Sequence, residues 1–265
     1  KRTAKIDHFN VVSSDFFLPP YEQVQSLFEE NTNFDLKEKE IIRDIWSDLQ
    51  QAYKFGSLIK LEEKLSIRLH GLTQSGTSLF SDIEATNFQQ FRDNFFSNLQ
   101  KAVSLNAAKQ GQTFLNTKTQ DAITFLQLIT QKYEIAVANP PYTDSADFGT
   151  ELKKFVDTNY RQPYKFNSNL YAVFIYRCCE LTDENGYVAL IHPHTFMFIK
   201  SFVDVREYLI EHTHIEILVD YGLDRVNLFG PGILLEATWY VLSKKKKENN
   251  GIYFNITSNQ QEREK

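Results

Sequence analysis

The stretch Tyr133-Glu134-Ile135-Ala136-Val137-Ala138-Asn139-Pro140-Pro141-Tyr142 decides the fold of this chain. Its first six residues are mostly apolar, and a short apolar run that ends in a turn signal predicts a buried strand. Two prolines then stiffen the corner at the carboxyl end of that strand. Ligands of parallel sheets bind beyond the carboxyl ends of the strands, so we expect a binding site at this corner.

The side chains of this corner suit a flat ring that bears an amino group. The Asn139 side chain and a main-chain carbonyl beside Pro140 accept hydrogen bonds, and Tyr142 offers a face for stacking. An aromatic amino group is a poor nucleophile because its lone pair is delocalised into the ring. Pre-aimed acceptors on its two N–H bonds draw it towards a tetrahedral geometry. The alternative is an ordinary turn, which is how we interpret 18–21, Leu-Pro-Pro-Tyr, where no side chain accepts.

The composition limits the class of protein. The chain has 265 residues, of which 42% are hydrophobic, enough for one packed domain with an appendage. A net charge of −5 excludes a global basic field, so any DNA-binding surface must be local. Cys178 and Cys179 are neighbours that rarely bridge each other, which favours a reduced, cytoplasmic protein. No run is long and apolar enough to suggest a membrane partner.

The hydrophobic pattern divides the chain into a mostly helical segment, 1–130, and a second part, 131–265. The first part begins with a short strand at 6–12. The second alternates strands and helices, which indicates an α/β fold with a largely parallel sheet. In it we expect helices at 119–132, 170–181 and 196–211, strands at 133–138, 187–191, 215–219 and 234–242, a strand at 252–256 paired with the preceding one, a turn at 183–186, and a long loop at 143–169.

The corner Asn139–Tyr142 resembles the catalytic motif of amino-group methyltransferases that use S-adenosylmethionine. Downstream segments resemble adenine-specific DNA methyltransferases, and residues 53–59 resemble a segment of the large enzymes among them. Those enzymes are methylase subunits of BREX phage-defence systems and type IIG restriction-modification enzymes. The downstream segments are 169–175, 181–186 and 187–191 with Pro193, Thr195 and Phe196.

The resemblance implies part of a Rossmann-like methyltransferase sheet with a helical insertion, acting on N6 of an adenine flipped out of double-stranded DNA. Asn139, Pro140, Pro141 and Tyr142 would form the catalytic corner, with Asn139 and Pro140 also bordering the donor. Phe229 would stack on the adenine opposite Tyr142. The resemblance further implies a bacterial restriction-modification or phage-defence system, whose other subunits are expected partners. Direct methyl transfer needs no metal, so we expect none.

The Gly-rich turn that holds the methyl donor in this family has no match before Asn139. Backbone must approach the donor closely there, and glycine permits this. The Gly-x-Gly pattern at 230–232 precedes a predicted strand and not a helix. We therefore expect this chain to be a piece of a larger enzyme that binds the donor weakly and is inactive alone.

Two alternatives remain open from the sequence. Glutamine methyltransferases and ribosomal-RNA base methyltransferases resemble the same motif, although they are usually compact and lack a long helical segment. The other alternative is a non-catalytic module that binds DNA or protein and has kept the fold. A Gly-rich donor motif in the complete reading frame would distinguish an enzyme from such a module.

Overall fold

The computed structural model describes the chain in two compact units, Lys1–Gln131 and Lys132–Lys265. The described residues are 36–61, 113–223 and 236–256, together with Val12, Pro20–Glu22, Gln25, Asp93, Phe96, Ser97, Gln100 and Lys101.

The described part of the first unit is helical. It contains α2 (Leu36–Leu49), α3 (Ala52–Phe55), the 3-10 turn η1 (Gly56–Leu58) and α6 (Thr113–Thr130), whose start precedes the predicted one. Apolar side chains at helical spacing are buried, which confirms the predicted helical pattern. They include Ile42, Ile45, Trp46, Leu49 and Ala52 in the first two helices and Ala122, Ile123 and Leu126 in α6. The strand predicted at 6–12 lies outside the described residues, except for Val12.

No helix in the described ranges combines the length and the apolar character that crossing a membrane requires.

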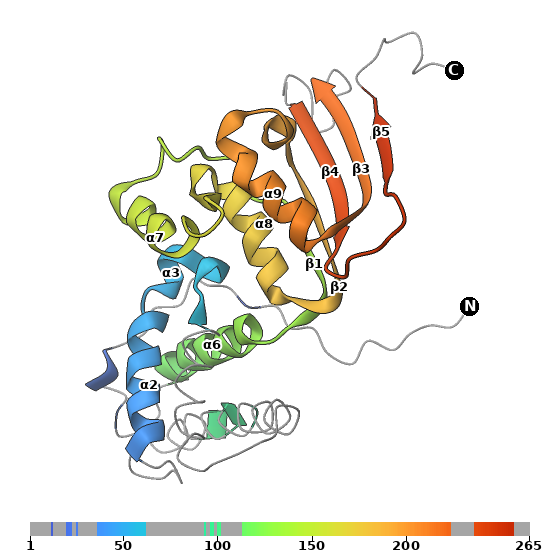
Figure 1. Ribbon diagram of the computed structural model, residues 1–265. Helices are drawn as coiled ribbons and strands as arrows, with labels where there is room; N and C mark the ends of the chain where they lie inside the picture. The colour runs from blue at the N-terminus through green and yellow to red at the C-terminus, as the bar shows by residue number, and fades with distance from the viewer. Residues whose placement is uncertain are drawn as a thin grey trace. The chain divides into compact units, whose positions relative to one another are not determined.

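The second unit is built on a mixed five-stranded sheet with the order β1-β2-β4-β3-β5 (Figure 1). The strands are β1 (Tyr133–Ala138), β2 (Thr182–Pro193), β3 (His214–Leu223), β4 (Glu236–Ser243) and β5 (Ile252–Asn255). β1 pairs with β2, and β3 with β5, in parallel, whereas β4 is antiparallel to both β2 and β3. The α/β class is confirmed, but the sheet is less parallel than predicted.

The predicted pairing of 252–256 with the strand before it is wrong. β5 pairs with β3, from Ile217 with Ile252 to Asp220 with Asn255. The reason is that β4 lies between β2 and β3, which occupy both of its edges. The free edge of β3 is therefore the one that β5 meets.

One face of the sheet is covered by helices. α8 (Leu170–Leu181) packs on β1 and β2, and α9 (Val203–His212) packs on β3 (Figure 1). Val188 and Leu190 point to the covered face and are buried. Ile135 and Val137 point to the other face and are 63% and 74% exposed, so the prediction that this strand is buried is wrong for its larger side chains. The alanines of β1 take the covered side.

The predicted long loop at 143–169 contains a helix, α7 (Thr150–Tyr160), and a 3-10 turn, η2 (Phe166–Ser168). Val156 and Tyr160, one helical turn apart, are buried and anchor α7. The predicted helix at 196–211 is instead two 3-10 turns followed by α9. The turns are η3 (His194–Met197) and η4 (Lys200–Phe202).

A bulge replaces the turn that was predicted at 183–186. β2 already begins at Thr182, and its register with β1 shifts between the pairs Tyr133–Thr182 and Ile135–Tyr187. The extra residues of β2 loop out there. A Cβ atom on Gly186 would lie 2.6 Å from the main-chain oxygen of Glu134, so glycine is required for the strands to approach. Beyond the bulge, β2 runs regularly to the site.

His192 is a core residue of this unit and not a surface ligand. Its ring stacks on Tyr171 of α8, with centroids 4.5 Å apart and planes 8° apart. Nδ1 lies 2.9 Å from the Pro193 carbonyl oxygen, which can only accept, so Nδ1 donates. The Tyr240 hydroxyl, 2.8 Å from Nε2, then donates to that nitrogen. One neutral tautomer satisfies both contacts, and burial lowers the pKa of His192 from 6.5 to about 4.

This pKa makes stability depend on pH. The unfolded chain binds a proton at His192 below about pH 6.5, whereas the folded chain does not until about pH 4. The stabilisation is therefore complete above about pH 6.5 and is lost as the pH falls towards 4, by roughly 3 kcal/mol. Between about pH 6.5 and pH 4, the free energy of unfolding of His192→Gln should fall by roughly 3 kcal/mol less than that of the wild type. Urea unfolding at several pH values measures this difference.

The matched control is His212→Gln, because the His212 side chain is 47% exposed. This control should keep the pH dependence of the wild type. Equal losses of stability in His192→Gln and the wild type would contradict the neutral, buried state of His192.

Candidate functional site

The motif Asn139–Tyr142 forms the corner at the carboxyl end of β1. Ala138, the last residue of the strand, pairs with Leu190, so β1 and β2 end at the same edge of the sheet. Pro140 is buried and Asn139 is exposed. The corner is thus anchored by a proline while its amide faces solvent.

Tyr142 orients Asn139. The Tyr142 hydroxyl donates to Oδ1 of Asn139 at 2.8 Å, and it lies 3.5 Å from the main-chain oxygen of Ile191 on β2. Burial raises the pKa of Tyr142, so the hydroxyl keeps its proton and remains a donor. Oδ1 has a second lone pair for a ligand. Tyr142 was predicted from the sequence to belong to the catalytic corner and to stack on the base; the contact of its hydroxyl with Asn139 was not predicted.

The chain that follows the motif is pinned to the start of α8. The Leu170 amide donates to the Thr143 oxygen at 2.9 Å, and Asp144 forms a β-bridge with Asn169. Asn169 also caps α8, because its side chain accepts from the Tyr171 amide at 3.1 Å. These contacts fix the path of the chain that follows the motif.

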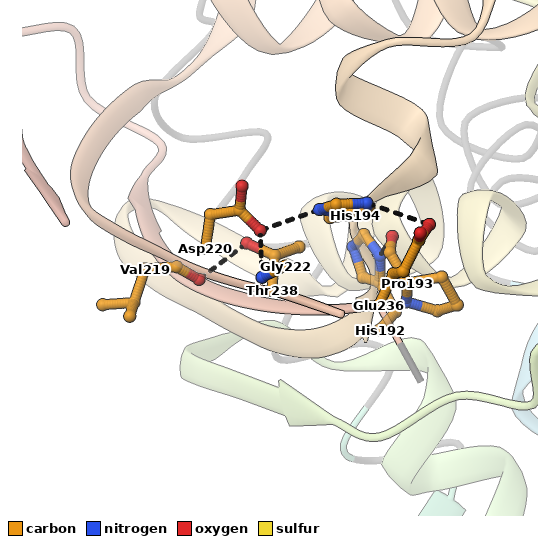
Figure 2. A network of polar contacts seen from close by, with 8 residues as sticks. All are labelled: His192, Pro193, His194, Val219, Asp220, Gly222, Glu236 and Thr238. Atoms are coloured by element: carbon orange, nitrogen blue, oxygen red, sulfur yellow. Dashed lines mark hydrogen bonds and ion pairs between the residues drawn. The ribbon is translucent and has the colours of Figure 1, made fainter. Parts of the chain in front are cut away.

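The exit of β2 supplies the neighbouring wall. Past the buried His192, the chain turns into η3 at His194. The Thr195 hydroxyl lies 3.0 Å from the hydroxyl of Tyr171. Figure 2 shows the polar network around this exit, in which His194 lies between Asp220 of β3 and Glu236 of β4. The contacts of His194 with these two carboxylates were not predicted from the sequence.

Phe229, the predicted second stacking residue, lies outside the described residues together with the rest of 226–231. No group of three or more His, Cys, Asp or Glu side chains in the described ranges is arranged to hold a metal ion.

The described glycines with positive φ do not form the kind of turn that cradles a methyl donor. A donor cradle needs glycine in a turn between a strand and a helix. The described glycines with positive φ are Gly56, between α3 and η1, and Gly222, inside β3. Neither follows a strand and opens a helix.

Comparison with known sequences gives relatives that match parts of the chain. The adenine-specific methyltransferase PglX of Lacticaseibacillus casei is 35% identical over 118 residues, covering 44% of this chain and 9% of that protein. BrxX, an adenine-specific methyltransferase of Escherichia coli, is 22% identical over 161 residues, covering 60% of this chain and 13% of BrxX. The matches thus span a small part of the length of these relatives.

Solved structures show a more distant likeness. A nuclease-deletion mutant of the type ISP restriction-modification enzyme LlaGI, in complex with a DNA substrate mimic, has a TM-score of 0.40 and 16% identity, covering 54% of this chain and 14% of that one. A putative class I S-adenosylmethionine-dependent methyltransferase from Listeria monocytogenes has a TM-score of 0.36 and 14% identity, covering 90% and 84%. At these scores the assignment of the family rests on sequence.

The family model described as Eco57I restriction-modification methylase matches residues 42–229. This range is more than half of the chain and contains Asn139–Tyr142 and all of β1, β2 and β3. The match confirms the resemblance that the motif indicated. The chain belongs to the Eco57I restriction-modification methylase family.

Proposed function

We propose that this chain supplies the base-binding half of a DNA methyltransferase that acts on N6 of adenine, in a restriction-modification or phage-defence system. The observation that carries the proposal is the corner of β1, where Tyr142 holds the Asn139 amide with its oxygen available to a ligand. Family membership and the names of the relatives support the reaction class.

In this proposal the corner binds the amino group of a flipped adenine. One N–H donates to Asn139 Oδ1 and the other to the main-chain oxygen of Pro140, which together make the nitrogen lone pair more available. The ring stacks on Tyr142, a contact of about 1–3 kcal/mol. Extruding a base from the duplex costs a few kcal/mol, so stacking and two hydrogen bonds are of the size needed to offset it. Phe229 is proposed as the opposite stacking face.

S-adenosylmethionine would supply the electrophilic methyl group. We propose that Asn139 and Pro140 border the donor, and that its glycine cradle is provided by another part of the full-length protein. This chain alone should then bind the donor weakly and show no activity. Isothermal titration of the chain with S-adenosylmethionine should give no micromolar binding, and a micromolar dissociation constant would overturn this part of the proposal.

Asn139→Ala in the full-length protein should abolish methylation. Removing one pre-aimed polar group from a transition state lowers rates by about a hundredfold to a thousandfold. The stability should change by less than about 1 kcal/mol, because Asn139 is exposed. The measurement is the N6-methyladenine content of digested DNA by mass spectrometry. Asn185→Ala is the control, since Asn185 is exposed in the bulge of β2. Near-complete activity in Asn139→Ala would end the assignment.

Substitutions of Tyr142 separate its two roles. Tyr142→Phe keeps the ring but removes the hydroxyl that orients Asn139. We expect single-turnover methylation to be roughly fivefold slower, because one net hydrogen bond contributes about 1 kcal/mol. Tyr142→Ala also removes the stacking face. Its rate should be lower than that of Tyr142→Phe by a further tenfold or more, because base–aromatic stacking contributes about 1–3 kcal/mol. Rates in Tyr142→Phe equal to the wild type would refute the orienting role, and equal rates in both variants would refute stacking.

A further inference from the structure

His194 is held between two carboxylates that come from different strands. Its Nδ1 lies 2.8 Å from Oδ1 of Asp220 on β3, and its Nε2 lies 3.0 Å from Oε2 of Glu236 at the start of β4 (Figure 2). Asp220 Oδ1 also accepts from the Gly222 amide at 2.9 Å. We call this set of three side chains the His194 clamp.

The clamp needs a proton on each ring nitrogen. An ionised carboxylate can only accept hydrogen bonds, so both Nδ1 and Nε2 must donate, which requires the charged imidazolium. A neutral ring would donate to one carboxylate and turn a lone pair towards the other. Glu236 would be the one to lose its bond, because its side chain is 48% exposed, whereas Asp220 is 9% exposed and is also tied to Gly222.

The clamp fastens the exit of β2 to β3 and β4. His194 directly follows the last residue of β2 and opens η3, and the same turn is held from α9 by Arg206, which donates to the main-chain oxygens of Phe196 and Ile199. Upstream in β2, the main-chain oxygen of Ile191 is the one that lies beside the Tyr142 hydroxyl. The position of the β2 exit is therefore linked to the residue that orients Asn139.

We propose that His194, in its protonated form, is a positioning residue for the target base. By joining Asp220 and Glu236, it fixes the wall formed by the β2 exit beside Asn139 and Tyr142. This inference rests on the proposed function. It adds that base positioning weakens as the pH rises, because the neutral ring cannot hold both carboxylates. Within the described ranges, the charged groups that contact this turn are Asp220 from β3, Glu236 from β4 and Arg206 from α9.

Glu236→Gln in the full-length protein is the decisive variant. The amide that this substitution introduces can accept from the protonated ring or donate to the neutral one, so the clamp would hold in both states. We expect the ratio of its single-turnover methylation rate to that of the wild type to be close to 1 near about pH 6. The ratio should rise to roughly fivefold or more near about pH 9, where a neutral imidazole in the wild type would leave Glu236 without its hydrogen bond. A ratio that does not change with pH would overturn the proposal.

His194→Gln tests the same clamp by removing the charge. Its single-turnover rate should fall about tenfold at saturating DNA and donor, the loss of a charge-assisted hydrogen bond. Its affinity for DNA should stay within about twofold, because phosphate contacts and not base positioning dominate affinity. If the affinity falls as much as the rate, His194 does not act by positioning the base. If His194→Gln is too unstable to be assayed, Glu236→Gln still tests the proposal, through the change with pH of its methylation rate relative to the wild type.

The controls separate this inference from the proposed function. His212→Gln should keep a rate ratio to the wild type that is constant with pH, because His212 contacts Tyr164 and not the clamp. If the wild-type protein does not methylate DNA, the proposed function fails and the inference fails with it. If the wild type is active, Asn139→Ala is inactive and the Glu236→Gln ratio is flat with pH, then the inference alone is wrong.

Discussion

The parallel pairing of β1 with β2 brings two strand exits to one edge of the sheet, and the proposed site depends on it. A parallel neighbour ends where its partner ends, so residues far apart in the sequence meet there without a dedicated loop. At one exit the motif presents the Asn139 amide; at the other, the Ile191 oxygen stands beside the Tyr142 hydroxyl. A shift of the β1 register by one residue would turn the β1 side chains to the opposite face.

Two histidines at the β2 exit have opposite surroundings. His192 faces the covered side of the sheet, between Tyr171 and Tyr240, where burial keeps its ring neutral. His194 lies just past the strand, where two carboxylates meet its ring nitrogens. The same residue type therefore serves in one case as an aromatic core residue and in the other as a bridge between two carboxylates. Position relative to the strand end decides between these roles.

The parts of the fold that depend on local chemistry could be predicted from the sequence. The apolar run and prolines at 133–142 predicted β1 and its corner, and α8 begins and ends where it was predicted, because Asn169 is a helix cap. The parts that depend on tertiary partners were not visible. An apolar run does not reveal which face of β1 is covered, so the exposure of Ile135 and Val137 was missed. The pairing of β5 depends on where β4 inserts, and the His194 clamp joins the first residue of η3 to residues of β3 and β4.

The central claim is that Asn139 receives the amino group of a flipped adenine. It is tested most directly by a structure of the full-length protein on its DNA target with a non-reactive donor analogue. The account predicts the adenine outside the duplex, with its amino nitrogen about 3 Å from Oδ1 of Asn139, hydrogen-bond distance, and its ring against Tyr142. An adenine that stays stacked in the duplex, or one that is flipped but bound away from Asn139, would contradict the account.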